Sequence, residues 1–133
     1  KPWFREEAID KWGNVYTDVF LFCSQEYEYG FTAATFSTEE ADQLICTISP
    51  HQSIFVDERD GYGRFNLLIY VDDELVYESP EIWDTTEPFE QVIDVSGSKT
   101  IRLSLKQGNG TNVVMSGPMG SIIVDGTLIN TPN

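Results

Sequence analysis

This sequence of 133 residues has a single histidine and lacks the common catalytic and nucleotide-binding motifs. His51 is the only histidine, so any Ser/His/Asp or Cys/His arrangement must use it. It follows Pro50 at an expected turn, where a solvated loop histidine is the simpler interpretation. Gly-x-Ser-x-Gly, Gly-x-x-x-x-Gly-Lys and His-Glu-x-x-His do not occur, which sets aside nucleophile-elbow hydrolases, P-loop enzymes and zinc proteases.

Cysteine is also scarce, with only Cys23 and Cys46 present. No Cys-x-x-Cys occurs, which removes the usual zinc and redox motifs. Both cysteines lie in apolar, strand-like runs. A disulfide between them would stabilise the fold by about 3 kcal/mol, whereas buried free thiols are also common in such runs. The sequence leaves both alternatives open.

Positive charge is in short supply, because 8 Lys and Arg stand against 22 Asp and Glu, for a net charge of −14. Phosphate backbones and anionic lipid surfaces are bound by clustered cations, so we expect neither nucleic acid nor an anionic membrane surface as a partner. No apolar run approaches the roughly 18 residues of a membrane span, so we expect no membrane insertion. The many carboxylates remain available for calcium.

The two ends of the chain have the composition of linkers. Lys1-Pro2-Trp3-Phe4-Arg5 lacks the apolar core of a signal peptide. Asn130-Thr131-Pro132-Asn133 resembles a linker stub. We therefore expect a mature or excised fragment of a larger parent protein. Residues 1–8 would be an N-terminal linker or edge segment, residues 9–129 a single β-sandwich module, and residues 130–133 a C-terminal linker stub.

Period-two alternation of apolar and polar residues dominates the chain. In Phe65–Val71 and Ile101–Lys106 the apolar residues recur at every second position, as in a strand with one face in a core. Such runs arrive about every 8–12 residues, which is the spacing of an all-β sandwich or barrel. Further strands are expected at Val19–Cys23, Phe31–Phe36, Leu44–Ser49, Ser53–Asp57, Leu75–Glu78, Phe89–Val95, Asn112–Met115 and Ser121–Val124.

Turn residues separate these runs. Asp72-Asp73 predicts a tight hairpin, and Ser96-Gly97-Ser98-Lys99 predicts a link between two strands. Asp125-Gly126 is interpreted as a further turn near the end of the chain. Ser37-Thr38-Glu39-Glu40 has the pattern of a capping box, and the following strand leaves room for at most one helical turn.

One acidic loop is a candidate for calcium. Asp57-Glu58-Arg59-Asp60-Gly61 follows an expected strand, and calcium collects carboxylate and carbonyl oxygens from such loops. Arg59 occupies the third position, where an EF-hand requires an acid or an amide. Asp57 and Asp60 are therefore candidate ligands of a structural calcium ion, and a solvated acidic turn is the alternative.

Three segments combine aromatic rings with polar side chains, as sugar sites do. A sugar ring rests its apolar C–H face on Trp or Tyr, while its hydroxyl groups bond to polar side chains at the rim. Each of these aromatic residues is also consistent with a ring that covers the edge of the core. The candidate carbohydrate ligands are Trp12, Asn14, Tyr16, Tyr62, Arg64 and Trp83.

A glycosidase needs only two carboxylates at a set separation, so counting acids does not exclude one. Its catalytic domain also needs a cleft wall around the sugar, and this chain has little material beyond the expected sheets. We therefore predict no catalytic residues and no required cofactor.

The order and spacing of several segments resemble the NPCBM-like carbohydrate-binding modules of mainly Gram-positive bacteria, over residues 9–129. The matching segments are Trp12-Gly13-Asn14-Val15-Tyr16, Leu44–Ile48, Asp57, Leu68–Ser79, Pro88-Phe89, Val92–Gly97 and Ile101-Arg102-Leu103. The resemblance implies a jelly-roll-like antiparallel β-sandwich, secretion or cell-surface display, and attachment to a glycoside hydrolase or another surface protein. Some relatives bind terminal galactose-type sugars and carry a structural calcium ion.

The chain differs from this family in the segments that bind the sugar in the sugar-binding branch. The glycine-histidine segment of the sugar-binding branch is replaced by Gly30–Thr35, and the usual Asn-Gly is absent around Gln43–Thr47. The first hypothesis is therefore a non-catalytic, extracellular carbohydrate-binding module that targets a parent protein to a polysaccharide or glycan. The second is a protein-interaction or spacer module of a surface protein that retains the sandwich without sugar binding.

Overall fold

The computed structural model describes residues 3–23, 33–52, 65–83, 85–107 and 121–130. Within these ranges the chain is all β, and none of it forms a helix suited to crossing a membrane. The strands are β1 (Trp3–Ile9), β2 (Val15–Cys23), β3 (Ala33–Ser37), β4 (Gln43–Pro50), β5 (Phe65–Val71), β6 (Glu74–Glu78), β7 (Phe89–Asp94), β8 (Thr100–Gln107) and β9 (Ser121–Ile129).

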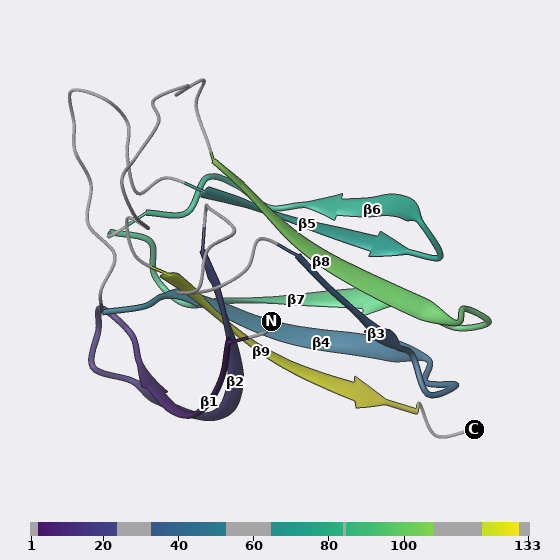
Figure 1. Cartoon of the computed structure of the whole chain (residues 1–133), viewed down its shortest axis with the longest axis horizontal. Coiled ribbons are helices and arrows are strands. Elements are labelled where there is room, and N and C mark those ends of the chain that lie inside the picture. Colours follow the sequence, from purple (N-terminus) through teal and green to yellow (C-terminus); the bar gives the residue numbers. More distant parts are fainter. Residues whose placement is uncertain (1–2, 24–32, 53–64, 84, 108–120, 131–133) are drawn as a thin grey trace.

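These strands form two antiparallel sheets that pack face to face (Figure 1). One sheet has the order β1-β2-β9-β4-β7, and the other has the order β3-β8-β5-β6. Among these strands, β1–β2 and β5–β6 are the only sequential pairs that share a sheet, so the chain winds back and forth between the layers. The predicted jelly-roll-like antiparallel β-sandwich is confirmed.

The core lies between the sheets and consists mostly of apolar residues from the predicted strands, together with Ala41 and Ile82 from outside them. Leu67 and Ile69 of β5 are fully buried, as are Ile101 of β8 and Ile48 of β4. A fully buried aliphatic side chain of this size stabilises a fold by about 1.5–3 kcal/mol relative to exposure. The buried core residues are Ala41, Leu44, Cys46, Ile48, Leu67, Ile69, Ile82, Ile93, Val95, Ile101, Leu103, Leu105, Ile122 and Val124.

The predicted hairpin at Asp72-Asp73 joins β5 to β6. Both residues have positive φ, 48° and 67°, which a tight two-residue hairpin turn requires and which Asp tolerates better than most residues. An Asp72 carboxylate oxygen also accepts the backbone N–H groups of Lys99 and Thr100, each at 2.9 Å. These bonds hold the pKa of Asp72 below its usual value and tie the hairpin to the predicted link between β7 and β8.

Two turns predicted from the sequence need correction. Asp125-Gly126 is not a turn, because both residues lie inside β9 and pair with Cys46 and Thr47 of β4. Ser37–Glu40 forms no helical turn. Glu39 and Glu40 have positive φ instead, and the Ser37 hydroxyl accepts the N–H of Glu39 at 3.0 Å.

At the start of the chain, Trp3–Ile9 forms the edge strand β1, which pairs with β2. The expected strands Ser53–Asp57 and Asn112–Met115 lie outside the described residues.

Cys46 is a free thiol, so the sandwich does not carry the Cys23–Cys46 disulfide that the sequence left open. Its side chain is fully buried between the sheets. Burial, with a smaller contribution from the charge of Asp125, raises the pKa of the Cys46 thiol to about 12. The reactive thiolate is therefore almost absent at neutral pH.

We expect Cys46 to resist thiol reagents in the folded protein. In a Cys23→Ser variant, which isolates Cys46, iodoacetamide labelling at pH 8 should be negligible over hours and should become rapid in denaturant. Mass spectrometry of the two samples measures the difference. Equal labelling rates with and without denaturant would contradict a buried, protonated thiol.

Candidate functional site

One end of the sandwich is organised around Asp10, which directly follows β1. Asp10 forms an antiparallel bridge with His51, which directly follows β4. Two backbone hydrogen bonds flank this bridge, from Lys11 N–H to the Pro50 carbonyl at 3.0 Å and from Gln52 N–H to the Ile9 carbonyl at 2.9 Å. The ends of an edge strand and of a central strand are thus joined outside the regular sheet pairing.

The Asp10 side chain is 2% exposed, and its carboxylate accepts five hydrogen bonds. One oxygen accepts the backbone N–H groups of Trp12 and Asn14, each at 2.9 Å. The other accepts the Asn14 side-chain amide at 3.0 Å, the Tyr16 hydroxyl at 3.0 Å and the Ser49 hydroxyl at 2.8 Å. A buried carboxylate without such donors would be strongly destabilising.

This donor set decides the charge of the site. Burial alone raises the pKa of the Asp10 carboxyl, but the hydrogen bonds from Asn14, Ser49 and Trp12 outweigh it and hold the pKa below its usual value. Asp10 is therefore an anion at neutral pH. Burial and then the hydrogen bond to Asp10 raise the pKa of the Tyr16 phenol, so Tyr16 remains a neutral donor.

The loop that Asp10 pins carries an exposed tryptophan. Trp12 is 49% exposed, and its indole Nε1–H donates to the Thr86 carbonyl at 2.8 Å. Gly13 has a φ of 86°, which allows the chain to turn back toward Asn14. The indole is therefore fixed at its polar edge while much of the ring meets solvent.

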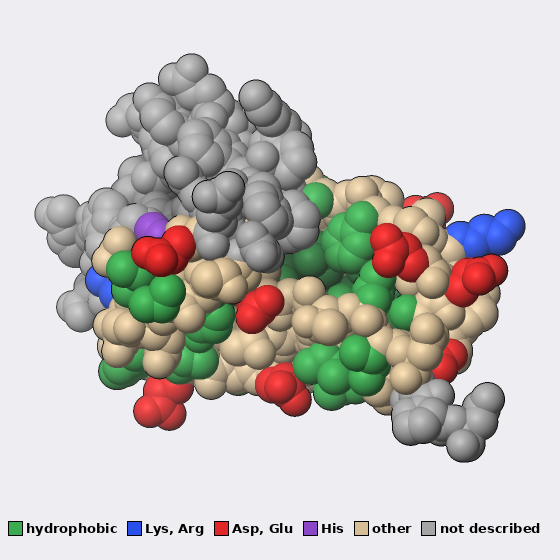
Figure 2. Space-filling model, turned by 90° about the horizontal axis from the view of Figure 1, so that it is seen from below, with side chains coloured by type: hydrophobic (Ala, Val, Ile, Leu, Met, Phe, Trp, Pro, Cys, Tyr) green, Lys and Arg blue, Asp and Glu red, His purple; other side chains and the backbone are tan. Residues whose placement is uncertain are grey.

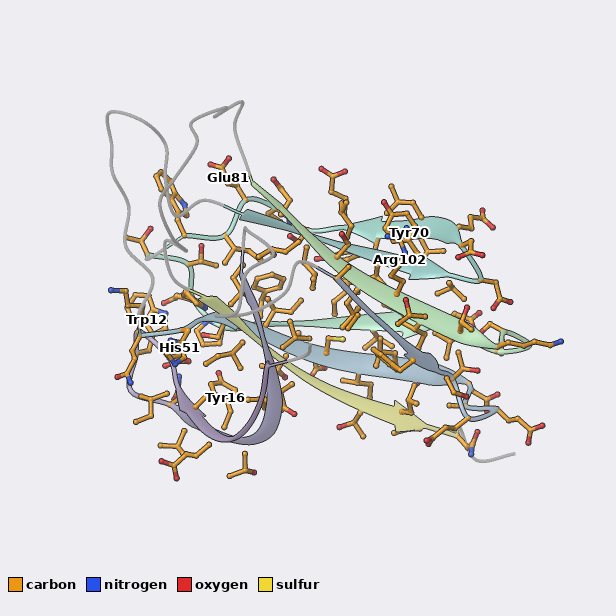
Figure 3. The ribbon with its side chains drawn as sticks, viewed as in Figure 1. Trp12, Tyr16, His51, Tyr70, Glu81 and Arg102 are labelled. Atoms are coloured by element: carbon orange, nitrogen blue, oxygen red, sulfur yellow. The ribbon has the colours of Figure 1, made fainter. Side chains whose placement is uncertain are left out.

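Thr86, which accepts the Trp12 hydrogen bond, is itself joined to Trp83 by two hydrogen bonds. Trp83 N–H donates to the Thr86 hydroxyl at 2.9 Å, and Thr86 N–H donates to the Trp83 carbonyl at 3.1 Å. Trp83 is half-buried. Figure 3 shows Trp12, His51 and Tyr16 at the same end of the sandwich. We call the surface formed by Trp12, Asn14, His51, Trp83 and Thr86 the Trp12 end.

The structure brings together four of the six predicted sugar ligands. The Trp12 indole and the Trp83 backbone N–H both donate to Thr86, and Asn14 and Tyr16 both donate to Asp10. Tyr62 and Arg64 lie outside the described residues. His51 was expected to be a solvated loop residue, but it is half-buried and is part of the bridge with Asp10.

Asp10, Ser49 and Thr86 were not predicted from the sequence as members of this site. A signal for Asp10 was present, because an Asp that precedes a Gly-containing loop commonly accepts the N–H group two residues later. No local signal identified Ser49 or Thr86, whose partners lie 39 and 74 residues away.

Tyr70, an aromatic residue of the other sheet, is covered by an arginine side chain. The guanidinium of Arg102, on β8, lies 4.0 Å from the centroid of the Tyr70 ring, on β5. Figure 3 shows this pair on the other layer, far from Trp12. Because Arg102 covers this ring face, Tyr70 is a weaker platform for a sugar than Trp12.

The predicted calcium ligands Asp57 and Asp60 lie outside the described residues. Within the part of the chain that the structure describes, no three His, Cys, Asp or Glu side chains are grouped to hold a metal ion.

Replacement of Asp10 by Asn should destabilise the protein. Asn keeps the shape but loses the charge, and its NH2 group faces donors, so we expect the free energy of unfolding to fall by about 2–3 kcal/mol. Urea unfolding at pH 7 measures the change. Glu90→Gln, at an exposed position of β7, is the matched control and should change stability by less than about 0.5 kcal/mol.

The same pair of proteins predicts a pH dependence. Because the folded-state pKa of Asp10 lies below its unfolded value of about 3.9, its stabilisation is complete above that value and is lost as pH falls through the folded-state pKa. The stability difference between wild type and Asp10→Asn should therefore be constant from pH 7 to 5 and shrink below pH 4. A difference that grew on acidification would contradict a depressed pKa.

No protein-family model matches the sequence, and no curated protein matches it. Solved structures do match the fold. The chain resembles part of Clostridium perfringens ZmpB, in a structure of its M60 catalytic domain with the CBM51-1 and CBM51-2 domains. The TM-score is 0.65 at 19% identity, with 95% of this chain and 12% of that chain covered.

Two ligand complexes match as well. For CBM51-2 of Clostridium perfringens ZmpB with GlcNAc and INT domains, the TM-score is 0.60 at 19% identity, covering 95% of this chain and 25% of that chain. For CBM51 of Clostridium perfringens GH95 with methyl-galactose, it is 0.57 at 13% identity, covering 90% and 76%. The chain thus spans a quarter or less of the two ZmpB chains. It has the β-sandwich fold of the CBM51 carbohydrate-binding modules.

Proposed function

We propose that this chain is a non-catalytic carbohydrate-binding module of the NPCBM-like type, in a secreted or cell-surface protein of a Gram-positive bacterium. It holds an attached enzyme or surface protein on a glycan. The observation that carries this proposal is the Trp12 indole, which is half exposed yet fixed by its Nε1–H bond to Thr86.

The physical fit to a sugar rests on the rigidity of Trp12. A sugar stacks its C–H face on an aromatic ring, and binding is weakened by any freedom that the ring must lose. Here the backbone of Trp12 is bonded to Asp10 and its ring nitrogen to Thr86, so little freedom remains to be lost. Tyr62 and Arg64 remain predicted rim residues.

The structural relatives support the same ligand class. Two of the CBM51 structures named above contain a sugar, GlcNAc in one and methyl-galactose in the other. In the third, the CBM51 domains occur with a catalytic domain. Function in such folds resides in the loops at the ends of the sheets, and these loops differ most between distant relatives. We therefore propose a sugar as the ligand and leave its identity to experiment.

Asp10, the carboxylate at the centre of the Trp12 end, is unsuited to acid–base catalysis. A general acid or base must exchange a proton with the substrate, which requires an accessible carboxyl group. Asp10 is buried, and both of its oxygens are engaged by the protein's own donors. Among the described carboxylates, the one at the centre of this end is thus structural.

Replacement of Trp12 by Ala should abolish glycan binding, because the stacking platform is lost. We expect at least a tenfold weakening, whereas Trp12→Phe should keep part of the affinity. A glycan array followed by calorimetry on the strongest ligand measures the effect. Tyr70→Ala, which removes an aromatic ring from the other sheet, is the control and should bind as wild type does.

Calcium is a separate proposal, at the predicted ligands Asp57 and Asp60. If they hold a structural ion, added CaCl2 should raise the melting temperature by several degrees relative to EDTA, because binding stabilises only the folded state. The double variant Asp57→Asn/Asp60→Asn should lose this shift. An equal shift in the variant would place the ion elsewhere.

The second candidate function is a protein-interaction or spacer module. It is favoured by Asn14 and Tyr16, whose polar hydrogens are turned inward to Asp10 rather than offered to a ligand. No binding to any glycan in the presence of calcium, by a folded wild-type protein, would favour this alternative.

A further inference from the structure

The inward-facing positions of β9 include one without a side chain. Ile122 and Val124 of this strand are buried and Leu128 is half-buried, as the period of two requires for a strand facing the core. Gly126 has the same parity, but it is exposed. The β9 strand is therefore open to solvent at Gly126, although the neighbouring Leu44 and Cys46 side chains are buried.

The contacts of Gly126 confirm its direction. A Cβ built on it would lie 3.4 Å from Leu44 Cδ1 and 3.7 Å from Cys46 Sγ, both of which belong to the core. Cys46 is also its direct partner in the β4–β9 ladder. Gly126 and Cys46 are thus two small residues that face the interior side by side, and they fill less of the space between the sheets than larger side chains would.

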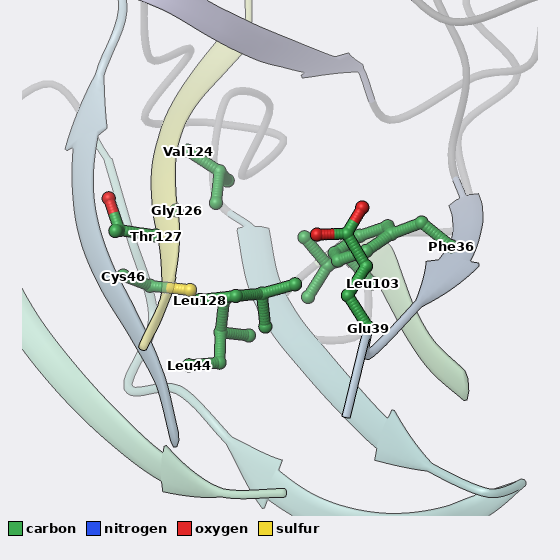
Figure 4. Close-up of a pocket in the computed structure, with 9 residues that line it drawn as sticks. All are labelled: Phe36, Glu39, Leu44, Cys46, Leu103, Val124, Gly126, Thr127 and Leu128. Atoms are coloured by element: carbon green, nitrogen blue, oxygen red, sulfur yellow. The ribbon is translucent and has the colours of Figure 1, made fainter. Parts of the chain in front are cut away.

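A cavity of about 450 Å³ occupies this place between the sheets (Figure 4). This volume lies in the range of about 300–1,000 Å³ that is typical of small-molecule sites. Its lining comes from both sheets: Phe36, Glu39, Leu44, Cys46, Leu103, Val124, Gly126, Thr127 and Leu128. Figure 2 shows apolar side chains around a hollow on this face, with acidic side chains around it.

The cavity has an apolar wall and one charged group at its mouth. Glu39 is exposed, and Figure 4 shows its carboxylate beside Phe36 and Leu103. The lining residues include no Lys, Arg or His. The neighbouring acids Glu40 and Asp125 add negative charge, in a chain with a net charge of −14. Charge complementarity therefore favours a cationic group on an occupant that reaches the mouth.

We propose that this cavity binds a small amphiphile with an alkyl chain or compact apolar group that ends in an ammonium ion. The apolar part lies against Phe36, Gly126 and Leu128, which are the more exposed apolar lining residues, and the ammonium group pairs with Glu39. The site goes beyond carbohydrate binding. Its β4 residues are Leu44 and Cys46, in the first half of that strand, whereas the Trp12 end lies beyond the final residue of β4.

Calorimetry with alkylammonium chlorides tests the site. With butyl-, hexyl- and octylammonium at pH 7 and below micellar concentrations, affinity should rise roughly fourfold per added CH2 group until the cavity is filled. Octylammonium should bind about fivefold or more tightly than octanoate and octan-1-ol. Absence of saturable binding, or equal affinity for the three octyl compounds, would overturn the proposal.

Variants locate the binding. Gly126→Val fills the cavity and should weaken octylammonium binding more than tenfold, with Gly126→Ala intermediate and easier to accommodate. Glu39→Gln should weaken it about threefold to fivefold and reduce the preference over octan-1-ol. Its matched control is Glu40→Gln, at an exposed neighbour outside the lining, which should bind as wild type does. Octylammonium affinity unchanged in both Glu39→Gln and Gly126→Ala would contradict this location.

Trp12→Ala separates this site from the proposed sugar site. It should leave octylammonium binding unchanged whether or not a glycan binds. A parallel loss of octylammonium affinity in Trp12→Ala would overturn the assignment to the cavity.

Discussion

The buried carboxylate of Asp10 is the constraint on which the Trp12 end depends. A charge in the protein interior is tolerated only when donors replace the water that it loses. Asp10 takes its donors from the loop after β1, from β2 and from β4, so the demand of one side chain joins three parts of one sheet. The position of Trp12 is a consequence, because its own backbone N–H is one of those donors.

The sandwich offers two surfaces of different chemistry. At the Trp12 end, a half-exposed aromatic ring is fixed by a hydrogen bond to Thr86, which suits the mixed apolar and polar faces of a sugar. Near the middle of β9, two small residues and a rim carboxylate leave an apolar space with a negative mouth. Both follow from the same architecture, since loops at the strand ends are free to carry polar networks while the space between the sheets must be apolar.

The solved structures share the fold of this chain at low sequence identity. Identities of 13–19% coexist with TM-scores of 0.57–0.65, because many apolar combinations satisfy a two-layer core. A sugar site needs particular groups at particular positions, and these are carried by loops. Trp12 and the Asp10 network thus have to be judged by their own geometry rather than by the shared fold.

The sequence by itself determined strands such as β5 and β8, because alternation in runs such as Phe65–Val71 allows only one face to be buried. It also determined the Asp72-Asp73 hairpin, because few residues accept two successive positive φ angles. Asp125-Gly126 misled it, since glycine signals a turn locally and only the opposing Cys46 shows that the strand continues. Trp12, Asn14 and Tyr16 were found as a group, but the roles of Asn14 and Tyr16 were set by Asp10. The partners of Asp10 and Trp12 are distant in the chain, at Ser49 and Thr86, and the opening at Gly126 lies between two sheets. Such contacts depend on which strands become neighbours in the folded protein, and local sequence propensity does not determine that pairing.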